Sequence, residues 1–310
     1  MKATRNLFCI VALVLFCAQV AGAKMVGWWK MDEMAGTTAN DSSGNDNHAT
    51  LMNGATWDQG RHGGAVRLDG NDDYVNLPIQ AIMDNLTDSS FCIWVNWVGS
   101  GGTWSRIWDF GNGTTFNMFL TPNSGAGNLR FAITVSSWAD EDQCNAPSML
   151  PTGWHHVAVT LDGQNHVAKL YLDGEVVAEN TALRYTPSSL APNTQNWLGR
   201  SQYAADPYLN GALDDFRIYD VVLDQAGVLR SMSGLGDNPA IAVVVSPANA
   251  AADVPRDAEL VWSAGIYPGT HDVYLGTAIE DVEAASRANP GSVLVSKGQT
   301  ATVYKPAVPL

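Results

Sequence analysis

Two acidic side chains lie on strand-like segments that otherwise carry large apolar groups. Glu33 belongs to VGWWKMDE, and Asp214 belongs to NGALDDFRIY. Because the side chains of a strand alternate between its two faces, Glu33 is expected to share a face with Trp29, and Asp214 with Phe216. An ionised carboxylate in such surroundings requires a cation, an arginine or several backbone N–H donors.

The loop DSSGNDN supplies further oxygen atoms close to Glu33 in the sequence. It contains Asp41 and Asn45, and its Asp, Ser, Gly and Asn residues favour tight turns. Calcium takes about six to eight oxygen ligands from carboxylates, amides and backbone carbonyls. If the strand of Asp214 lies beside the strand of Glu33, these four residues predict a structural calcium site.

Two other arrangements would also satisfy these carboxylates. Arg217 or Lys30 could form an ion pair with one of them, or a carboxylate could cap the loop at 41–47. The histidines offer no competing metal site, because they are scattered singly or adjacent on a strand and lack zinc-ligand spacing.

The tryptophans suggest sugar binding, because an indole ring can stack on the face of a pyranose. Trp104 and Trp138 lie in polar loops, and Asp140 and Asp142 follow Trp138 closely enough to bind sugar hydroxyls or calcium. We predict these four residues as ligand contacts, with loop anchoring as the alternative for the two rings. Seven other tryptophans lie in strand-like segments and are expected in the core: Trp28, Trp29, Trp94, Trp97, Trp154, Trp197 and Trp262.

The first 23 residues are typical of a signal peptide. Lys2 and Arg5 precede an apolar run, and Ala21-Gly22-Ala23 forms an A-x-A cleavage site. The chain carries 17 basic and 31 acidic residues, and loss of the leader changes its formal charge from −14 to −16. We therefore expect a secreted or cell-surface protein that neither binds nucleic acid nor inserts into a membrane after leader removal.

Two of the four cysteines lie in this leader. The other two, Cys92 and Cys144, could form one disulfide in an exported protein or remain separate, since the sequence does not give their distance.

The clearest structural signal is the segment Trp154 to Val177. Two runs rich in β-branched and aromatic residues are followed by Asp162-Gly163 and Asp173-Gly174, dipeptides expected to supply the positive φ of tight hairpin turns. The segment therefore predicts three antiparallel strands, with the face that carries Val157 and Val159 toward the core.

Several motifs resemble a known family. VGWWKMDE with DSSGNDNH, AVRLDGNDDYV, the meander WHHVAVTLDG…KLYLDGE and NGALDDFRIY occur in the order typical of laminin-G-like domains, which belong to the concanavalin A-like lectin/glucanase superfamily. The resemblance implies an all-β fold, a two-sheet antiparallel jelly-roll sandwich over residues 24–232. It also implies that NGALDDFRIY pairs beside VGWWKMDE, and some jelly-roll modules hold a structural calcium near their termini.

A second module is expected after a linker at 233–240. Residues 241–310 resemble the first part of an immunoglobulin-like or fibronectin type III-like β-sandwich with Trp262 in its core. Such a sandwich takes about 100 residues, so we expect this one to be incomplete.

The residues and the resemblance together favour recognition over catalysis. A resemblance to the hydrolases of this superfamily would require E-x-D-x-E or E-x-D-x-x-E on one strand, and this sequence lacks that pattern. Asp140 and Asp142 have no apolar surroundings to raise the pKa of a catalytic acid. We predict a non-catalytic module that binds an extracellular glycan or glycoprotein. The alternatives are an adhesive or structural cell-surface protein that binds protein partners and, third, a glycoside hydrolase.

Overall fold

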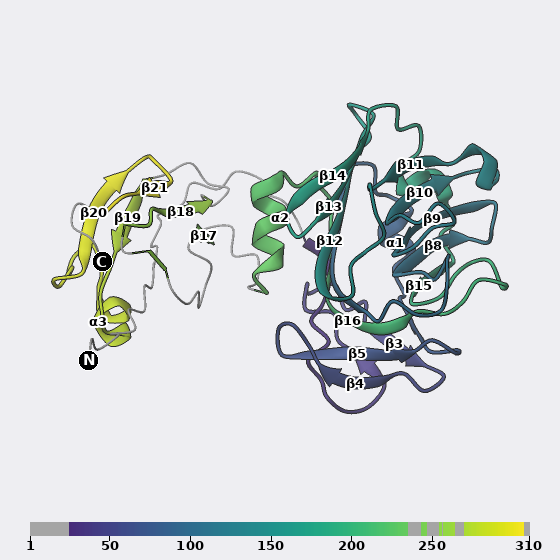
Figure 1. Cartoon of the computed structure of the whole chain (residues 1–310), viewed down its shortest axis with the longest axis horizontal. Helices are drawn as coiled ribbons and strands as arrows, with labels where there is room; N and C mark the ends of the chain where they lie inside the picture. The colour runs from purple at the N-terminus through teal and green to yellow at the C-terminus, as the bar shows by residue number, and fades with distance from the viewer. Residues whose placement is uncertain (1–24, 235–242, 247–253, 256, 264–269, 307–310) are drawn as a thin grey trace. The chain divides into compact units, whose positions relative to one another are not determined.

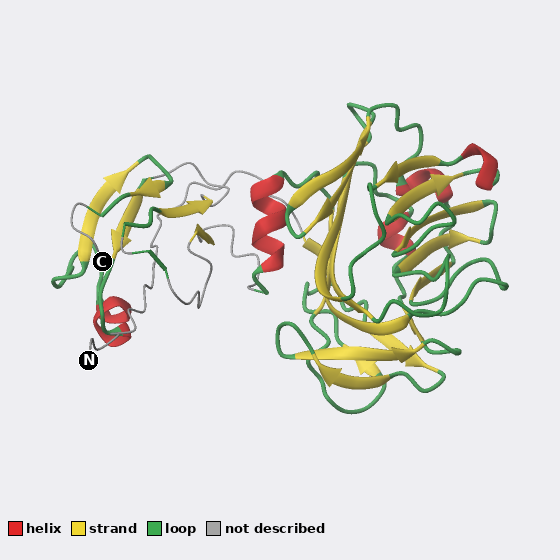
Figure 2. Cartoon of the chain, viewed as in Figure 1, coloured by secondary structure: helices red, strands yellow, loops and turns green. Residues whose placement is uncertain are grey.

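The computed structural model describes residues 25–234, 243–246, 254–255, 257–263 and 270–306. The chain divides into two compact units, one spanning Ala23–Leu235 and another that includes Gly236–Leu310. Each unit is built mainly from strands, as Figure 2 shows. The predicted signal peptide at 1–23 and most of the predicted linker lie outside the described residues.

The first unit is a sandwich of two antiparallel eight-stranded sheets (Figure 1). Sheet A consists of β1 (Met25–Trp29), β4 (Thr56–Gln59), β5 (Gly64–Asp69), β7 (Ser89–Trp97), β12 (Gly153–Asp162), β13 (Val167–Leu172), β14 (Glu175–Asn180) and β16 (Asn210–Tyr219). Sheet B consists of β2 (Thr38–Ala39), β3 (Ala49–Met52), β6 (Tyr74–Asn76), β8 (Trp108–Asn112), β9 (Phe116–Thr121), β10 (Arg130–Thr134), β11 (Asp142–Asn145) and β15 (Gln195–Leu198). The jelly-roll fold expected from the sequence is confirmed.

The inner faces of the two sheets share one core. Alternate residues of β7 and β8, such as Ile93 and Trp108, are fully buried in it, and Trp108 stacks on Phe110 with ring centroids 4.9 Å apart. Two short helical segments, α1 (Gln80–Met83) and η2 (Pro187–Leu190), also contribute buried side chains to this core. Burial of the apolar faces is the main source of stability in such a sandwich.

The central meander forms as predicted, with one error in its first turn. β12 pairs with β13, and β13 pairs with β14. Asp173 and Gly174 have φ of 49° and 86°, so the second turn has the predicted conformation. In the first turn the residue with positive φ is His166, at 57°, and not Gly163. Asp162 closes this longer loop by accepting the Asn165 N–H, and Gly163 donates its own N–H to Asp88 of a distant segment.

The last strand of the domain pairs with the first, as predicted, but its residues do not alternate as predicted. β16 pairs with β1, and a register shift lies between Asp214 and Arg217. Asp215 adopts φ of 51° at this β-bulge. Because a bulge inserts one residue, Leu213 and Phe216 both face the core, and the predicted common face of Asp214 and Phe216 is wrong.

The helix α2 (Gln225–Met232) packs on part of the outer face of sheet A. Asp224 caps the helix by accepting a hydrogen bond from the Gly227 N–H. Figure 1 shows α2 against the sheet, and a second apolar cluster includes Cys92 and Val228. The helix therefore buries the part of this face around Cys92 and Val228.

Cys92 and Cys144 are both free thiols, so of the two states that the sequence left open the structure has the unbridged one. The Cys92 side chain belongs to the cluster outside sheet A, whereas Cys144 lies in the central core and its Sγ donates to the Ala168 carbonyl. The two thiols therefore lie on different sides of sheet A.

The described part of the second unit contains two small sheets. One is formed by β17 (Val243–Ser246), β18 (Leu260–Ser263) and β21 (Val303–Tyr304), and the other by β19 (His271–Tyr274) and β20 (Leu294–Gln299), with one helix, α3 (Ile279–Ala284). Trp262 is buried, as predicted, and its ring meets His271 edge-on. The immunoglobulin-like assignment stays a prediction.

A search for apolar helices in the described residues finds none of the length and hydropathy required to cross a membrane.

Candidate functional site

Asp41 holds the loop that was predicted to bind calcium. Its Oδ1 accepts hydrogen bonds from the backbone N–H groups of Trp28 and Ser43, and its Oδ2 accepts one from Asn47. Burial opposes ionisation of Asp41, but these hydrogen bonds together hold its pKa below the ordinary value. Asn45 donates its side-chain N–H to the Val26 carbonyl. The structure thus shows Asp41 as a loop cap, the alternative that the sequence left open.

Glu33 and Asp214 contact different groups. Strand β1 ends at Trp29, and the Glu33 Oε1 accepts hydrogen bonds from the backbone and side chain of Asn40. Asp214 instead accepts the N–H of His62 through Oδ2 at 2.8 Å. Burial raises the pKa of Asp214 from 3.8 to about 7, against the lowering effect of that hydrogen bond.

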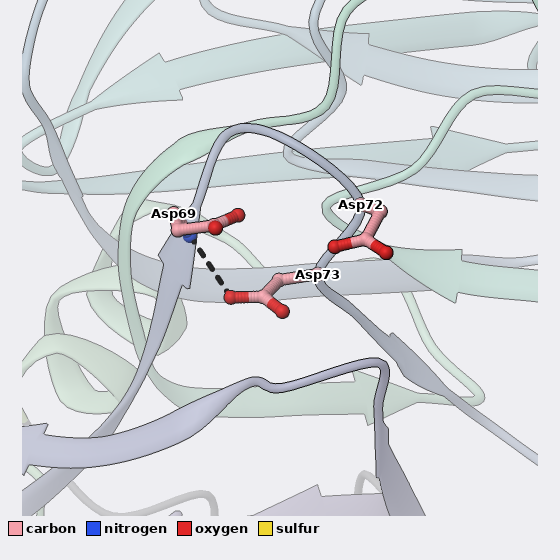
Figure 3. A group of neighbouring side chains, drawn as sticks. All are labelled: Asp69, Asp72 and Asp73. Atoms are coloured by element: carbon pink, nitrogen blue, oxygen red, sulfur yellow. Dashed lines mark hydrogen bonds between the residues drawn. The ribbon is translucent and has the colours of Figure 1, made fainter.

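The carboxylates that do converge lie in the turn between β5 and β6. Asp69, Asp72 and Asp73 each place one carboxylate oxygen within 4.8 Å of those of the other two, and they form the only such group among the described residues (Figure 3). Asp73 accepts the Asp69 N–H, and burial together with the two neighbouring charges raises its pKa. In the sequence this turn belongs to one of the family motifs, and its acidic cluster was not predicted.

The predicted contacts around Trp138 are partly assembled. The ring of Trp138 is 71% exposed in a short 3-10 segment, η1 (Trp138–Asp140). Asp140 and Asp142 lie on either side of Arg184, with N–O distances of 2.8 and 2.7 Å. The Tyr185 hydroxyl also donates to Asp140. Both carboxylates are therefore held by protein donors, and the indole remains open to solvent.

Trp104 lies apart from Trp138, over sheet B. Its φ is 73°, its backbone N–H donates to Asn123, and its ring meets Phe119 edge-on. The guanidinium groups of Arg106 and Arg130 lie 5.8 and 5.3 Å from the ring centroid. Trp104 thus covers the part of the outer face of sheet B that carries Phe119, Arg106 and Arg130.

Beneath this part lies a buried ion pair. Asp109 is inaccessible to solvent and bonds Arg106, which also contacts Asp206 at 2.9 Å. Burial raises the pKa of Asp109 to about 7, although Arg106 acts in the opposite direction. Burial likewise raises the pKa of Glu141, beside Arg130. Because Asp109 is inaccessible, it cannot contact a substrate in this conformation.

The other part of the outer face of sheet B carries partly exposed aromatic rings. Tyr74 lies on β6, Trp197 lies on β15, and Tyr208 lies in the connection to β16. The Tyr74 ring centroid is 6.2 Å from Trp197 and 6.5 Å from Tyr208. Arg200 lies over both Trp197 and Tyr74, with its guanidinium carbon 4.1 and 4.8 Å from the two centroids. We call these four residues the aromatic patch.

Hydrogen-bonding side chains border the aromatic patch. Asn76 lies opposite Trp197 in the β6–β15 ladder, and Gln195 lies two residues before Trp197 on the same face. Both are partly exposed. Such a combination of rings and amides is typical of sites that bind sugars, because rings cover the apolar faces and amides bond the hydroxyls.

The aromatic patch was not predicted, because Trp197 on its strand-like segment was expected in the core. A usable signal existed: in the short strand Gln195–Leu198 the core residue is Leu198, and its neighbour Trp197 must face outward. The contact of Trp197 with Tyr74 joins separate segments and has no local signature.

A family model described as the concanavalin A-like lectin/glucanases superfamily, Laminin_G_3, matches residues 69–229. This match covers just over half of the chain, and the chain belongs to that family. No curated protein matches the chain.

Two solved structures show the same fold. Domain 4 of AbnA, an extracellular arabinanase from Geobacillus stearothermophilus, is 22% identical, with a TM-score of 0.56; the match covers 67% of this chain and 98% of that one. The binding domain of Paraclostridial Mosquitocidal Protein 1 is 16% identical, with a TM-score of 0.52; that match covers 67% of this chain and 51% of the other. At these identities the likeness concerns the fold.

Proposed function

We propose that the jelly-roll domain is a secreted, non-catalytic module that binds carbohydrate through the outer face of sheet B. The observation that carries this proposal is the difference between the two outer faces of the sandwich. Helix α2 covers part of that of sheet A, whereas sheet B presents the partly exposed aromatic patch of Tyr74, Trp197, Arg200 and Tyr208.

The chemistry of the aromatic patch suits a sugar better than an apolar ligand. Aromatic rings attract the C–H-rich face of a sugar ring, and the amides of Asn76 and Gln195 can bond its hydroxyls. The rings support one another through edge contacts, so little order has to be gained on binding.

The similar arabinanase domain supports the same class of ligand. It was solved in complex with arabinotriose, and its fold corresponds to two thirds of this chain. Oligosaccharides of this kind are therefore reasonable first probes, although the low identity gives no basis for transferring the sugar specificity.

The non-catalytic part of the proposal rests on the buried acids. Asp109 and Glu141 have raised pKa values, as general acids of glycosidases do, but Asp109 is inaccessible and bonded to Arg106. Secretion rests on the leader at residues 1–23.

A glycan array probed with residues 24–235, followed by calorimetric titration of the best oligosaccharide, tests the proposal. Replacement of Trp197 by Ala should weaken binding by about tenfold or more, because it removes a central ring of the patch. Trp154 provides a matched control: it is also a partly buried tryptophan, but it lies on the outer face of sheet A. Trp154→Ala should bind as the unmodified protein does.

Absence of glycan binding on the array would overturn the proposal. Binding that survives Trp197→Ala but is lost in Trp138→Ala would move the site to the exposed indole beyond β10. Unfolding midpoints of all three variants, measured by circular dichroism, show whether a loss of binding reflects a loss of fold.

A further inference from the structure

Arg200 differs from the other arginines near the outer face of sheet B in having no anionic partner. Arg106 bonds Asp109 and Asp206, and Arg130 lies 3.9 Å from Glu141. Arg200 makes no hydrogen bond or ion pair with any residue that the structure describes; its contacts are the rings of Trp197 and Tyr74.

The two rings fix the orientation of this guanidinium. Its carbon lies 4.1 Å from the Trp197 centroid and 4.8 Å from that of Tyr74, distances at which cation and ring attract each other. A guanidinium carries its N–H donors on its edges, and none of those of Arg200 bonds a residue that the structure describes, so they are available to a ligand. Arg200 is only partly exposed, and some of its hydration is already lost.

These contacts favour an anionic ligand atom. A fixed guanidinium can bond a carboxylate or sulfate through two parallel N–H groups, and such bonds are about twice as strong as neutral ones. Partial burial beside aromatic rings strengthens the attraction between Arg200 and an anionic group, because the local dielectric constant is lower than in water.

We propose that Arg200 recognises a carboxylate or sulfate group on the glycan, so that the aromatic patch prefers acidic to neutral sugars. This inference rests on the proposed function and specifies its substrate class. The acceptor oxygens of the acidic group bond the outer N–H edge of Arg200, while the sugar ring contacts Tyr208 and the exposed parts of Tyr74 and Trp197.

The surrounding charge limits how many acidic groups the ligand carries. The chain has a formal charge of −14, and the acidic turn with Asp69, Asp72 and Asp73 directly precedes Tyr74. A densely charged polymer would be repelled by this surface. The expected ligand is therefore a glycan with a single acidic residue at the subsite of Arg200.

Matched pairs of probes test this inference by calorimetric titration of the whole mature chain. Methyl galacturonoside and its methyl ester differ by one carboxylate charge, and 3′-sulfolactose and lactose differ by one sulfate. We expect the charged member of at least one pair to bind about tenfold or more tightly. The pair that shows the preference distinguishes a carboxylate from a sulfate.

Variants at Arg200 assign the preference to this residue. Arg200→Gln should reduce the ratio of charged to neutral affinity to near one, and Arg200→Lys should retain part of it, because lysine keeps the charge without the planar fork. Arg61→Gln is the matched control: Arg61 is also stacked on a tryptophan, with its guanidinium carbon 5.1 Å from the Trp94 centroid, but Trp94 faces outward from sheet A. It should leave the ratio unchanged.

Equal affinity for both members of each pair, or a preference that survives Arg200→Gln, would overturn the inference. Failure of both charged probes to bind would overturn it as well. The proposed function survives either result if the glycan array shows binding to neutral sugars that Trp197→Ala removes. Unfolding midpoints show whether each variant is folded.

Discussion

Trp197 and Asp109 lie directly opposite each other in the ladder between β15 and β8, yet one is partly exposed and the other is inaccessible. The difference arises from the segment after β15. Gln202 donates its backbone N–H to Asp109 and its side-chain N–H to the Gln195 carbonyl, and Asp206 reaches Arg106. The segment after β15 covers Asp109 and ends beside the Trp197 ring. The outer face of sheet B therefore has a buried ion pair next to the partly exposed aromatic patch.

The buried Asp214 should make the stability of the domain depend on pH. Its folded-state pKa, about 7, lies above the ordinary 3.8, so between pH 4 and 7 the folded state binds more protons than the unfolded state. The free energy of unfolding should therefore decrease as pH rises through this window. Asp214→Asn should reduce the decrease, because its side-chain oxygen can still accept the His62 N–H without carrying a charge.

Thermal unfolding at pH 5 and pH 8 measures this effect. The exposed Asp58, whose side chain contacts only the backbone of Gln59, provides the control, and Asp58→Asn should keep the unmodified pH dependence. Asp109 contributes in the same direction, so part of the decrease should persist in Asp214→Asn. A pH dependence identical in Asp214→Asn and the unmodified protein would contradict the assignment.

Asp41 should stabilise the domain without calcium. Its carboxylate accepts backbone N–H groups from Trp28, Ser43 and Asn47, and loss of its charge should destabilise the fold by about 1–3 kcal/mol. We expect Asp41→Asn to lower the unfolding midpoint equally in calcium and in chelator. Asp46→Asn, an exposed change in the same loop, should have little effect.

Calcium binding itself stays a prediction. A calcium-dependent midpoint that is lost only in Asp41→Asn would support the predicted set of Glu33, Asp41, Asn45 and Asp214. A calcium-dependent midpoint that is lost in Asp72→Asn would place the ion at the acidic turn instead.

Trp138 should affect binding without affecting stability. Its ring is 71% exposed, so Trp138→Ala should change the free energy of unfolding by less than about 0.5 kcal/mol. The sequence predicts it as a ligand contact, and we expect its loss to weaken glycan binding less than Trp197→Ala does. Isothermal titration of both variants with one oligosaccharide compares them, and a larger loss in Trp138→Ala would reverse the order of importance.

The cysteines should respond to denaturation and not to reductant. Cys92 and Cys144 are buried, and burial raises the pKa of the Cys144 thiol to about 12. In the mature chain we expect both thiols to react with Ellman's reagent only after unfolding. A midpoint that falls on addition of reductant would indicate a disulfide and contradict the structure.

The sequence by itself determined the strand meander from Trp154, the pairing of NGALDDFRIY beside VGWWKMDE and the family. These features follow from alternation, turn residues and motif order, which are properties of short segments. Burial of most tryptophans was also predictable, since a large ring on an alternating strand has few alternatives to the core.

Tertiary structure alone decided which polar groups meet. The bulge at Asp215 moves every later residue of β16 to the opposite face of the sheet. The hydrophobic pattern of the sequence does not reveal this shift of one residue. The ion pairs of Arg184 and the contact of Arg200 with the Tyr74 ring join residues distant in sequence. Local pattern specifies which residues can form strands, whereas the position and burial of a charge depend on contacts between strands and loops that only the folded chain brings together.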